Sequence, residues 1–288
     1  MMWWANPLDK LLKRVSGRRV LVVWNRGLGD IPLGLVALVH RIRSYIKDPE
    51  IFFLTRSDLA EGFAFIPGVF VLVAPHWVRG GSIDLEETLA SLGHALADFD
   101  CILERPDPTR HLRWQIGSFI PKLQWQERFE VAPEAYGLDV NLRYIGVHVH
   151  SETVYSYEKN WPEERWQGLF SRLPEGSQVL LFGMQPKSSF SMPRVHDLRG
   201  KTSLCAVLSL IKNVCSALVV PDSGLLAFTY YLDLSFPLKI VSLWADPRQG
   251  VLRQAVESPN PQLVHVPLFG KKEQIATISE EMVLEALL

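Results

Sequence analysis

The sequence predicts an α/β protein of two domains, each built on a doubly wound sheet of mainly parallel strands. Short β-branched runs alternate with apolar residues at helical spacing along the chain. The alternation restarts at Tyr144, after a polar stretch over residues 132–143. The length of 288 residues suits two domains of ordinary size. We therefore expect domains at 1–140 and 141–275, followed by a C-terminal helix within 276–288.

The individual elements follow from two hydrophobic patterns. Compact apolar runs predict strands at 19–24, 50–54, 69–74 and 101–103 in the first domain, and at 144–149, 178–182, 217–221 and 239–244 in the second. Apolar residues three and four positions apart predict helices that include 35–42, 85–96, 161–173, 204–211, 225–232 and 280–288. Strands that alternate with helices in this way are typical of parallel sheets.

The composition is that of an ordinary globular protein of a reducing compartment. Hydrophobic residues make up 48% and charged residues 21%, and the net charge of -1 gives no general attraction to nucleic acid. The three cysteines lie within apolar runs, which argues against a disulfide framework and against a zinc site. No apolar run is long enough to span a bilayer, and early charges argue against a signal peptide. We expect a cytoplasmic protein.

The first 47 residues are rich in Lys and Arg and contain only Asp9 and Asp30 as acids. Trp3 and Trp4, followed by leucines at helical spacing, predict a short basic amphipathic helix. Two interpretations stay open. This helix either makes peripheral contact with the anionic inner face of the cytoplasmic membrane, or packs on its domain with a solvated basic face.

The first glycine-rich turn is Gly27-Leu28-Gly29-Asp30, at the carboxyl end of the first predicted strand. Ligands of open α/β sheets bind at such strand ends. Pro32 occupies the place of the third glycine of a dinucleotide fingerprint, which argues against a nicotinamide oxidoreductase. Asp30 could serve as a general base or as a helix N-cap, and the local sequence does not decide between these roles.

Two loops of the second domain suit phosphate groups. Lys159 precedes a predicted helix, where a lysine adds positive charge to the helix N-terminus. The alternative is a solvent-exposed loop lysine. Ser151 and Thr153 supply hydroxyls in the same loop. The turn formed by Asp222, Ser223, Gly224 and Leu225 joins a buried strand to an apolar helix, and its N–H groups suit a pyrophosphate. Asp222 or Ser223 could instead act only as an N-cap.

Two patterns are compatible with metal ligands, but neither predicts a metal site. His148 and His150 alternate on one strand without a nearby carboxylate or cysteine partner. Asp98-Phe99-Asp100 leads directly into the strand at Cys101 and is better interpreted as a turn that starts this strand. We predict no metal ion and no cofactor.

In order and context these motifs resemble glycosyltransferase family 9, the ADP-heptose:lipopolysaccharide heptosyltransferases. Gly29-Asp30 resembles the family's amino-terminal GD motif, and the segment from Lys159 to Trp166 resembles its K-x-W-P segment. Further matches are Leu181-Phe182-Gly183, the segment from Leu198 to Leu204, and Asp222-Ser223-Gly224. The resemblance covers most of the chain. It departs at Ala227, where family members usually carry a histidine.

The resemblance implies a GT-B fold, with two Rossmann-like domains facing a central cleft and the C-terminal helix packed back on the N-terminal domain. It implies inverting transfer of a heptose from ADP-heptose to a lipid-linked oligosaccharide of the lipopolysaccharide core. Asp30 would be the catalytic base. The donor would contact Ser151, Thr153, Lys159, Gly183, Asp222, Ser223, Gly224 and Leu225. The acceptor would contact Gly29, Arg105, Arg110 and Arg113.

Two other functions remain open. The same fold could use a different donor sugar. A degenerate GT-B module could bind a nucleotide or a glycan without turnover, and Ala227 is consistent with that hypothesis.

Overall fold

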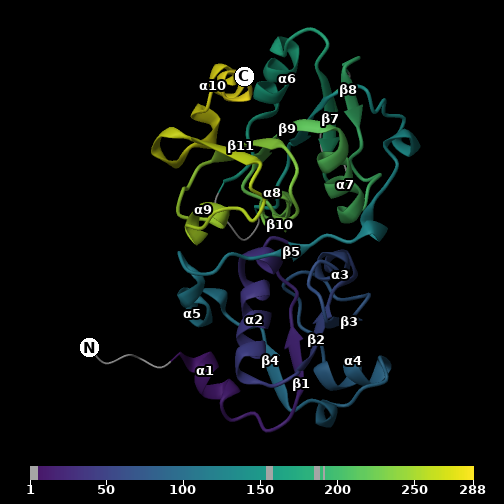
Figure 1. Cartoon of the computed structure of the whole chain (residues 1–288), viewed down its shortest axis with the longest axis vertical. Helices are drawn as coiled ribbons and strands as arrows, with labels where there is room; N and C mark the ends of the chain where they lie inside the picture. Colours follow the sequence, from purple (N-terminus) through teal and green to yellow (C-terminus); the bar gives the residue numbers. More distant parts are fainter. Residues whose placement is uncertain (1–5, 154–157, 185–188, 191) are drawn as a thin grey trace. The chain divides into compact units, whose positions relative to one another are not determined.

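The computed structural model describes residues 6–153, 158–184, 189–190 and 192–288. The chain forms two compact units, Met1–Gln124 and Trp125–Leu288 (Figure 1). Each unit contains a parallel sheet with helices, so the predicted fold class is confirmed. Within the described residues no helix combines the length and the apolar character needed to cross a membrane.

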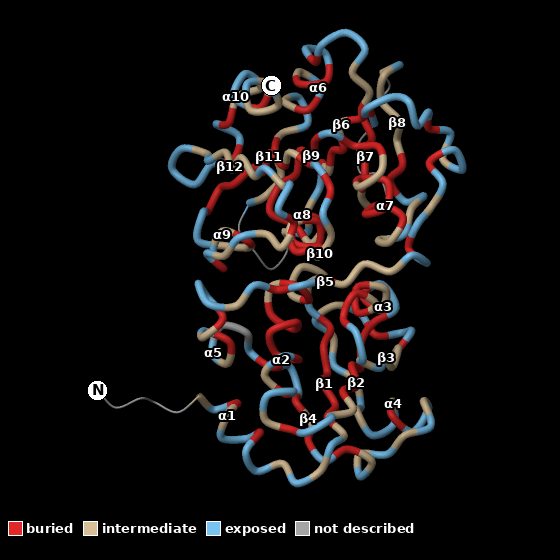
Figure 2. The backbone as a smooth tube through the Cα atoms, viewed as in Figure 1, coloured by how far each residue is buried: buried red, intermediate tan, exposed pale blue. Residues whose placement is uncertain are grey.

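The first unit is built on a four-stranded sheet in the order β3-β2-β1-β4. Its strands are β1 (Arg19–Val23), β2 (Glu50–Thr55), β3 (Val69–Val73) and β4 (Cys101–Glu104), and β5 (Leu123–Gln124) lies outside this sheet. Val20 pairs with Ile51 on one side and with Cys101 on the other, in parallel register. The sequence of β1 is apolar on both faces, as expected for a strand in the interior of a parallel sheet. Figure 2 shows that β1 is largely buried.

The helices of the first unit connect these strands. They are α1 (Pro7–Leu12), α2 (Val36–Tyr45), α3 (Ser57–Phe63), α4 (Leu85–Ser91) and α5 (Pro108–His111), with short helical turns at Ile31–Leu35, Leu96–Asp98 and Arg113–Gln115. The turn Ile31–Leu35 is a π-helical entry to α2, and Pro32 lies in its first turn. The sequence analysis did not predict α3, because Leu59 and Phe63 are its only large apolar residues and do not form a clear helical stripe.

The second unit is built on a six-stranded parallel sheet in the order β12-β11-β9-β6-β7-β8. The strands are β6 (Tyr144–His148), β7 (Gln178–Phe182), β8 (Val195–Asp197), β9 (Cys215–Pro221), β11 (Leu238–Trp244) and β12 (Leu263–Phe269), with β10 (Leu232–Asp233) outside this sheet. The helices are α6 (Glu163–Arg172), α7 (Leu204–Val214), α8 (Gly224–Tyr230), α9 (Gly250–Gln254) and α10 (Glu280–Leu287). The sequence analysis did not predict the edge strand β12, because His265 and Pro267 interrupt its apolar run.

The division between the units lies between Gln124 and Trp125, earlier in the chain than the expected division at residue 140. The reason is that the intervening segment packs on α7. Glu130 accepts hydrogen bonds from Ser209 and Asn213 at 3.0 and 2.9 Å and forms an ion pair with Lys212 at 2.8 Å. The polar character of residues 132–143 therefore reflects an exposed surface segment of the second unit and not a linker between the two.

The C-terminal helix α10 packs on α6 within the second unit. Two ion pairs, Arg165–Glu280 at 2.7 Å and Arg172–Glu281, join these helices. The fully buried Val283 belongs to the hydrophobic core of the second unit. Charge pairing and apolar burial therefore both hold α10 in place.

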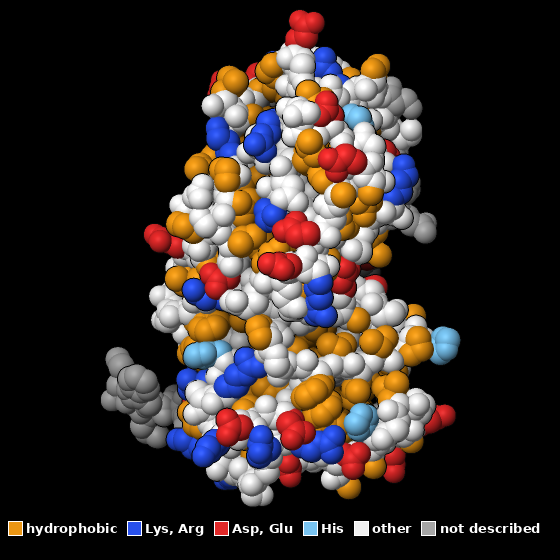
Figure 3. Space-filling model, turned by 45° about the vertical axis from the view of Figure 1, so that its right-hand side comes forward, with side chains coloured by type: hydrophobic (Ala, Val, Ile, Leu, Met, Phe, Trp, Pro, Cys, Tyr) orange, Lys and Arg blue, Asp and Glu red, His pale blue; other side chains and the backbone are white. Residues whose placement is uncertain are grey.

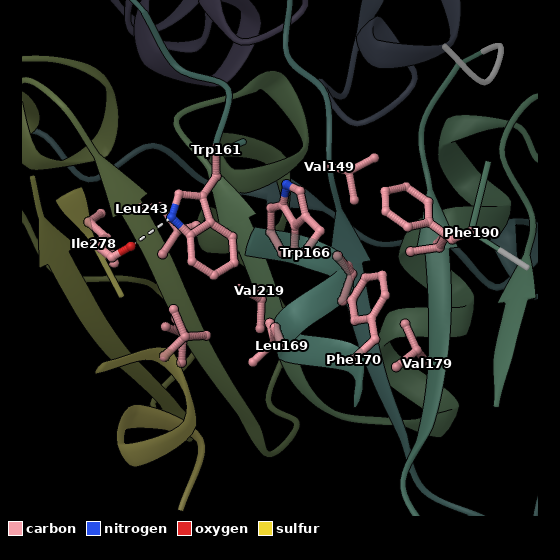
Figure 4. Close-up of a cluster of buried hydrophobic side chains, with 14 of the residues drawn as sticks. Val149, Trp161, Trp166, Leu169, Phe170, Val179, Phe190, Val219, Leu243 and Ile278 are labelled. Atoms are coloured by element: carbon pink, nitrogen blue, oxygen red, sulfur yellow. Dashed lines mark hydrogen bonds between the residues drawn. The ribbon is translucent and has the colours of Figure 1, made fainter. Parts of the chain in front are cut away.

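The core of the second unit surrounds two buried tryptophans at the start of α6 (Figure 4). The rings of Trp161 and Trp166 meet edge to face with centroids 4.9 Å apart. The indole N–H of Trp161 points to the carbonyl oxygen of Ile278 and donates a buried hydrogen bond of 2.9 Å. This bond joins the loop before α6 to the segment before α10.

The surface of the first unit carries exposed apolar groups on the side of the edge strand β3. Phe70 is 52% exposed and stacks on Phe52 with ring centroids 4.8 Å apart. Figure 3 shows hydrophobic side chains on this face of the unit, above a row in which acidic and basic side chains alternate. The edge strand is therefore only partly covered by its own domain.

We predict that Trp161→Phe lowers the free energy of unfolding more than Trp166→Phe does. Both changes remove a similar volume from one core. Only Trp161 donates its N–H to a partner, whereas the buried N–H of Trp166 has no partner among the described residues. Losing the Trp161 bond leaves the Ile278 carbonyl unsatisfied, which costs about 1–3 kcal/mol. This corresponds to a fall in thermal midpoint of several degrees, roughly 2–4 °C per kcal/mol.

Thermal melts of both variants followed by tryptophan fluorescence and circular dichroism measure this difference. Equal midpoints for the two variants would show that the hydrogen bond to Ile278 contributes nothing to stability.

Candidate functional site

In the second unit, the site is built where β6 and β9 end side by side. The neighbours of β6 are β7 on one side and β9 on the other, so the order of strands along the chain reverses at this point. Ligands of open parallel sheets bind at the carboxyl ends of strands at such a switch point. The hydroxyl of Ser151, after β6, donates a hydrogen bond of 3.1 Å to the backbone oxygen of Asp222, after β9.

Lys159 lies at the same junction. Its ammonium forms an ion pair of 2.9 Å with the carboxylate of Asp222, and the two side chains are 16% and 9% exposed. The alternative of a solvent-exposed loop lysine is therefore wrong. A mostly buried cation next to a strand switch point is a suitable partner for an anionic ligand, because low local dielectric strengthens its field.

The loop that carries Lys159 is held by its neighbour Asn160. The amide oxygen of Asn160 accepts the N–H of Ser151 at 2.7 Å, and its amide nitrogen donates to the oxygen of Ser151 at 3.1 Å. This paired contact fixes Ser151 and Lys159 relative to each other. Thr153 lies half-buried in the same loop, next to residues 154–157, which lie outside the described part of the chain.

In the turn after β9, Ser223 and Asp222 have different roles. The hydroxyl of Ser223 accepts the N–H of Leu226 at 3.2 Å, so Ser223 is the N-cap of α8. Asp222 does not cap this helix, and its carboxylate pairs with Lys159. Gly224 starts α8 and Leu225 is buried in it. Because α8 has only seven residues, the positive group at this junction is the ammonium of Lys159, which the Asp222 carboxylate balances.

Gly250 is a residue of this site that the sequence analysis missed. It has a φ of 51°, and a Cβ atom there would lie 2.2 Å from a carboxylate oxygen of Asp222 and 2.8 Å from the ring of Trp244. Only glycine fits so close to the carboxylate. The signal was a glycine a few residues after the strand ending at Trp244, in a loop that carried no motif.

Gly183 follows β7 directly, beside His148, and has a φ of 142°, a conformation that favours glycine. A Cβ atom there would lie 3.3 Å from the His148 ring and 3.8 Å from Arg199, whose guanidinium pairs with Asp197 at 2.7 Å. Burial, together with the smaller effect of the neighbouring His150, lowers the pKa of His148 to about 4. The imidazole is therefore neutral at pH 7, and no metal-type cluster of His, Cys, Asp and Glu occurs among the described residues.

In the first unit, Asp30 lies beyond the carboxyl end of β1, at the switch point where β1 has β2 on one side and β4 on the other. One of its carboxylate oxygens accepts the N–H of Gly27 at 2.9 Å, and it makes no side-chain capping bond to the helix that follows. The helix N-cap alternative is therefore wrong, because the carboxylate closes the glycine turn behind it. Gly29 lies within this turn, and its oxygen accepts the N–H of Leu33.

Arginines surround this edge of the first sheet. Arg105 follows β4 in a left-handed conformation with a φ of 47° and donates to the oxygen of Gly81 at 3.2 Å. Arg79 lies near the turn, since its guanidinium is 3.8 Å from the position of a Cβ atom on Gly27. Arg110 and Arg113 are exposed on α5 and on the short helix after it. The sequence analysis missed Arg79 because no motif surrounds it.

Arg56 is a further arginine that the sequence analysis missed, and its side chain binds the backbone oxygen of Asn25. It is buried, donates to the oxygen of Asn25 at 2.6 Å, and makes two 2.8 Å hydrogen bonds to Asp58. The amide of Asn25 in turn donates to Gly81 at 2.9 Å. These bonds fix the strand ends around the glycine turn. The polar groups around Asp30 are therefore held in place by the fold.

Comparisons with known proteins give one family. Residues 120–230 match the model of glycosyltransferase family 9 (heptosyltransferase). The sequence matches no curated protein. The Escherichia coli ADP-heptose lipopolysaccharide heptosyltransferase II has a similar structure, with a TM-score of 0.66 and 17% identity over 93% of this chain and 97% of that chain.

Two further solved structures are similar. A family 9 glycosyltransferase from Veillonella parvula DSM 2008 gives a TM-score of 0.62 with 18% identity, over 94% of this chain and 96% of that chain. The Escherichia coli heptosyltransferase WaaC, solved with ADP, gives 0.53 with 17% identity, over 93% and 98%. At these identities the likeness establishes the fold. Residues 120–230 therefore match glycosyltransferase family 9 (heptosyltransferase), and the chain as a whole has the GT-B fold of these similar structures.

Proposed function

We propose that this chain is an inverting glycosyltransferase that moves a heptose or a related sugar from ADP-heptose to a hydroxyl of a lipopolysaccharide core or similar glycan. The observation that carries the proposal is the meeting of Ser151, Lys159 and Asp222 at the strand junction, inside the segment that matches the family. A mostly buried ammonium beside hydroxyl and backbone donors suits a nucleoside diphosphate. The similar WaaC was solved with ADP, which supports the choice of nucleotide.

The donor diphosphate is bound in the second unit. Lys159 neutralises the charge that develops on the leaving diphosphate. Thr153 donates its hydroxyl to the diphosphate, and Ser151 does so once its hydroxyl turns away from the Asp222 oxygen. The other proposed donor residues are Gly183, Asp222, Ser223, Gly224 and Leu225. Asp222 holds Lys159 in position, and Gly183 leaves room beside His148. In this scheme the lysine performs the charge neutralisation that a metal ion performs in other phosphate chemistry.

The acceptor is bound by the first unit, and Asp30 is its general base. The acceptor oxygen attacks the anomeric carbon from the face opposite the diphosphate, so the configuration inverts. The hydroxyl proton moves to Asp30 as the bond between the anomeric carbon and the diphosphate oxygen breaks. Gly29 lets the substrate approach the backbone. Arg105, Arg110 and Arg113 hold the anionic groups of a lipid-linked oligosaccharide.

One observation favours a second function. Ala227, at the position where the family usually carries a histidine, is 1% exposed within α8 and offers no polar group to a donor. A module that binds nucleotide or glycan without turnover is the corresponding alternative. The same departure leaves room for another donor sugar on the same fold.

We predict that ADP raises the thermal midpoint more than UDP, GDP or CMP does, and that ADP-heptose with a truncated lipopolysaccharide yields a product heavier by one heptose. A ligand present at about 100 times its Kd stabilises the fold by roughly 2.7 kcal/mol. Mass spectrometry of the acceptor detects the product. An ADP-dependent shift without product, across several donor sugars, would select the binding module. No shift with any nucleotide would contradict the glycosyltransferase and would leave only a module that binds glycan.

We predict that Lys159→Ala weakens ADP binding by roughly ten- to a hundredfold, the equivalent of a charge-assisted hydrogen bond of about 1.5–3 kcal/mol. The physical reason is twofold, since the variant loses the cation and exposes the diphosphate to the unpaired Asp222 carboxylate. Lys159→Arg keeps the charge and retains part of the affinity. Calorimetry with ADP measures both variants.

The matched control is Lys201→Ala. Lys201 belongs to the same unit, and its ammonium donates to the backbone oxygen of Asp197. Its variant should bind ADP as the wild-type chain does. Unchanged affinity in Lys159→Ala, with its fold intact by thermal melt, would remove Lys159 from the donor site.

We predict that Asp30→Asn reduces turnover by roughly 10²–10⁴-fold, the usual contribution of a positioned general base. The asparagine oxygen can still accept the N–H of Gly27, so fold and thermal midpoint should be kept. ADP affinity should also be kept, because the proposed donor residues belong to the second unit. Turnover is measured as product formed per folded molecule.

Two variants complete this experiment. Asp84→Asn is the matched control, since Asp84 also accepts a backbone N–H, that of Glu87 at 2.9 Å, but at the start of α4. It should retain full turnover. Asp30→Ala removes the contact to Gly27 and should also lower stability by about 1 kcal/mol. Near wild-type transfer by Asp30→Asn would show that Asp30 is not the base.

A further inference from the structure

In the described part of the chain, the two large parallel sheets have four edge strands, and these differ in how their outer edges are protected. An unpaired strand edge tends to pair with another chain, and natural proteins prevent this with charges, prolines or very short strands. The edge strand β8 has three residues, one of which is Asp197. The edge strand β12 contains Pro267, and β4 ends at Glu104, directly before Arg105. Each of these strands therefore carries such a protection.

The edge strand β3 of the first sheet is the exception (Figure 1). Its residues are all apolar, and residues 63–78 contain no Asp, Glu, Lys or Arg. All five residues of β3 keep part of their surface exposed, whereas β1 and β2 each bury all residues but the first. Phe70 is 52% exposed, and Val78, shortly after the strand, is 67% exposed. An apolar, uncharged edge of this kind is suited to pairing with another strand.

The backbone of β3 directs hydrogen-bonding groups outward at alternate residues. In the described part of the chain, β3 pairs with β2 on one side and lies at the end of the sheet on the other. Ala74, directly after β3, donates its N–H to the oxygen of Thr55 in β2 at 2.8 Å. Because successive residues of a strand direct their backbone groups to opposite edges, the odd-numbered residues direct theirs outward. These residues are Val69, Val71 and Val73.

This outer edge is complementary to a second copy of itself. A two-fold axis that passes beside Val71, perpendicular to the sheet, brings two β3 strands together in antiparallel orientation. Val71 then faces Val71 of the other copy, Val69 faces Val73, and these pairs exchange N–H and C=O hydrogen bonds. Phe70 faces Leu72 in the closely spaced pairs between them, so the exposed ring gains an apolar neighbour. Every opposed pair is apolar, and no like charges meet.

Two prolines favour this register over others. Pro67 and Pro75 lie at equal distances from Val71, one on each side of the strand. Proline has no N–H to donate, so each proline ends the row of hydrogen bonds. In the register centred on Val71, Pro67 of one copy faces Pro75 of the other, and neither faces a residue of β3. A shift of the register by two residues places a proline opposite β3 and loses hydrogen bonds.

We propose that this chain forms a two-fold symmetric dimer by antiparallel pairing of β3 with β3 of a second copy. The pairing continues one four-stranded sheet into the other. It covers Phe70 and satisfies the outward backbone groups of the strand. A second copy is the occupant, because an unrelated partner does not require a strand whose pattern and flanking prolines are symmetric about its middle residue. The dimer does not rest on the proposed function.

The first test is sedimentation velocity of the full chain over a range of concentrations. The pairing of two five-residue strands is a small interface, so we expect a reversible dimer with a Kd of about 10 µM. Between about 1 and 200 µM the mass should rise from that of one chain towards that of two.

Two lysine variants locate the interface. Phe70→Lys should raise the Kd by roughly a hundredfold or more, because the dimer contains two Phe70 contacts and each lysine would bring a charge into an apolar interface. The matched control is Phe269→Lys, since Phe269 is 44% exposed on the edge strand β12 of the other sheet. It should dimerise as the wild-type chain does. Thermal midpoints and circular dichroism show that each variant is folded.

A cysteine variant tests the register and keeps the edge apolar. In the proposed pairing the two Val71 Cα atoms lie about 5.5 Å apart, within the range of about 4.4–6.8 Å that a disulfide spans. Val71→Cys should therefore form a covalent dimer under mild oxidation, and a reducing agent should reverse it. Phe269→Cys is the control for random collisions and should cross-link much more slowly.

The dimer is rejected if the wild-type chain keeps the mass of one chain at about 200 µM. It is also rejected if Phe70→Lys, in folded form, dimerises as tightly as the wild-type chain, or if Phe269→Lys weakens the dimer equally. A wild-type dimer in which Val71→Cys cross-links no faster than Phe269→Cys would reject the pairing through β3. These readouts involve neither nucleotide binding nor sugar transfer, so they are separate from a failure of the proposed function.

Discussion

Parallel pairing of β6 with β9 is the constraint on which the candidate site depends. Because the two strands run in the same direction, their carboxyl ends bring residues 149–153, 158–160 and 222–225 to one junction. The buried ion pair between Lys159 and Asp222 closes this junction. Removing one partner of such a buried pair leaves an uncompensated charge, which costs about 3–5 kcal/mol. The pair therefore couples the geometry of the loop to that of the strand ends.

In both units side-chain contacts hold the ends of the strands at the edge of the sheet, but the kinds of contact differ. In the second unit the strand ends are joined by an ion pair and by the Asn160 contact to Ser151. In the first unit they are joined by backbone-directed side chains, with Arg56 and Asn25 fixed to neighbouring carbonyls and Asp30 closing its own glycine turn. Each arrangement satisfies polar groups that the sheet leaves open at its edge. A rigid edge in each unit is what a group-transfer site requires, since small displacements of reacting groups cost much of the rate.

The segments that depart from expectation share a physical cause. The residues after Gln124 join the second unit because Glu130 collects hydrogen bonds and an ion pair from α7. The last helix stays with the same unit because Glu280 and Glu281 face arginines of α6 while Val283 is buried. Such contacts join residues that are about 80 to 120 positions apart. Hydrophobic patterns within a short stretch of sequence do not predict these long-range contacts.

The sequence by itself determined the fold class, most strands, and the loops that carry chemistry, because hydrophobic period and turn residues are local properties. It identified Asp30, Lys159 and Asp222 as candidate site residues. For each it also left a non-functional interpretation open, a helix N-cap for the two aspartates and an exposed loop residue for the lysine. Only the tertiary structure decided that Lys159 is paired with Asp222 and that Asp30 holds Gly27 and caps no helix. It alone revealed Gly250 and the exposed apolar edge of β3. These facts depend on which surfaces meet in space, and long-range packing decides that.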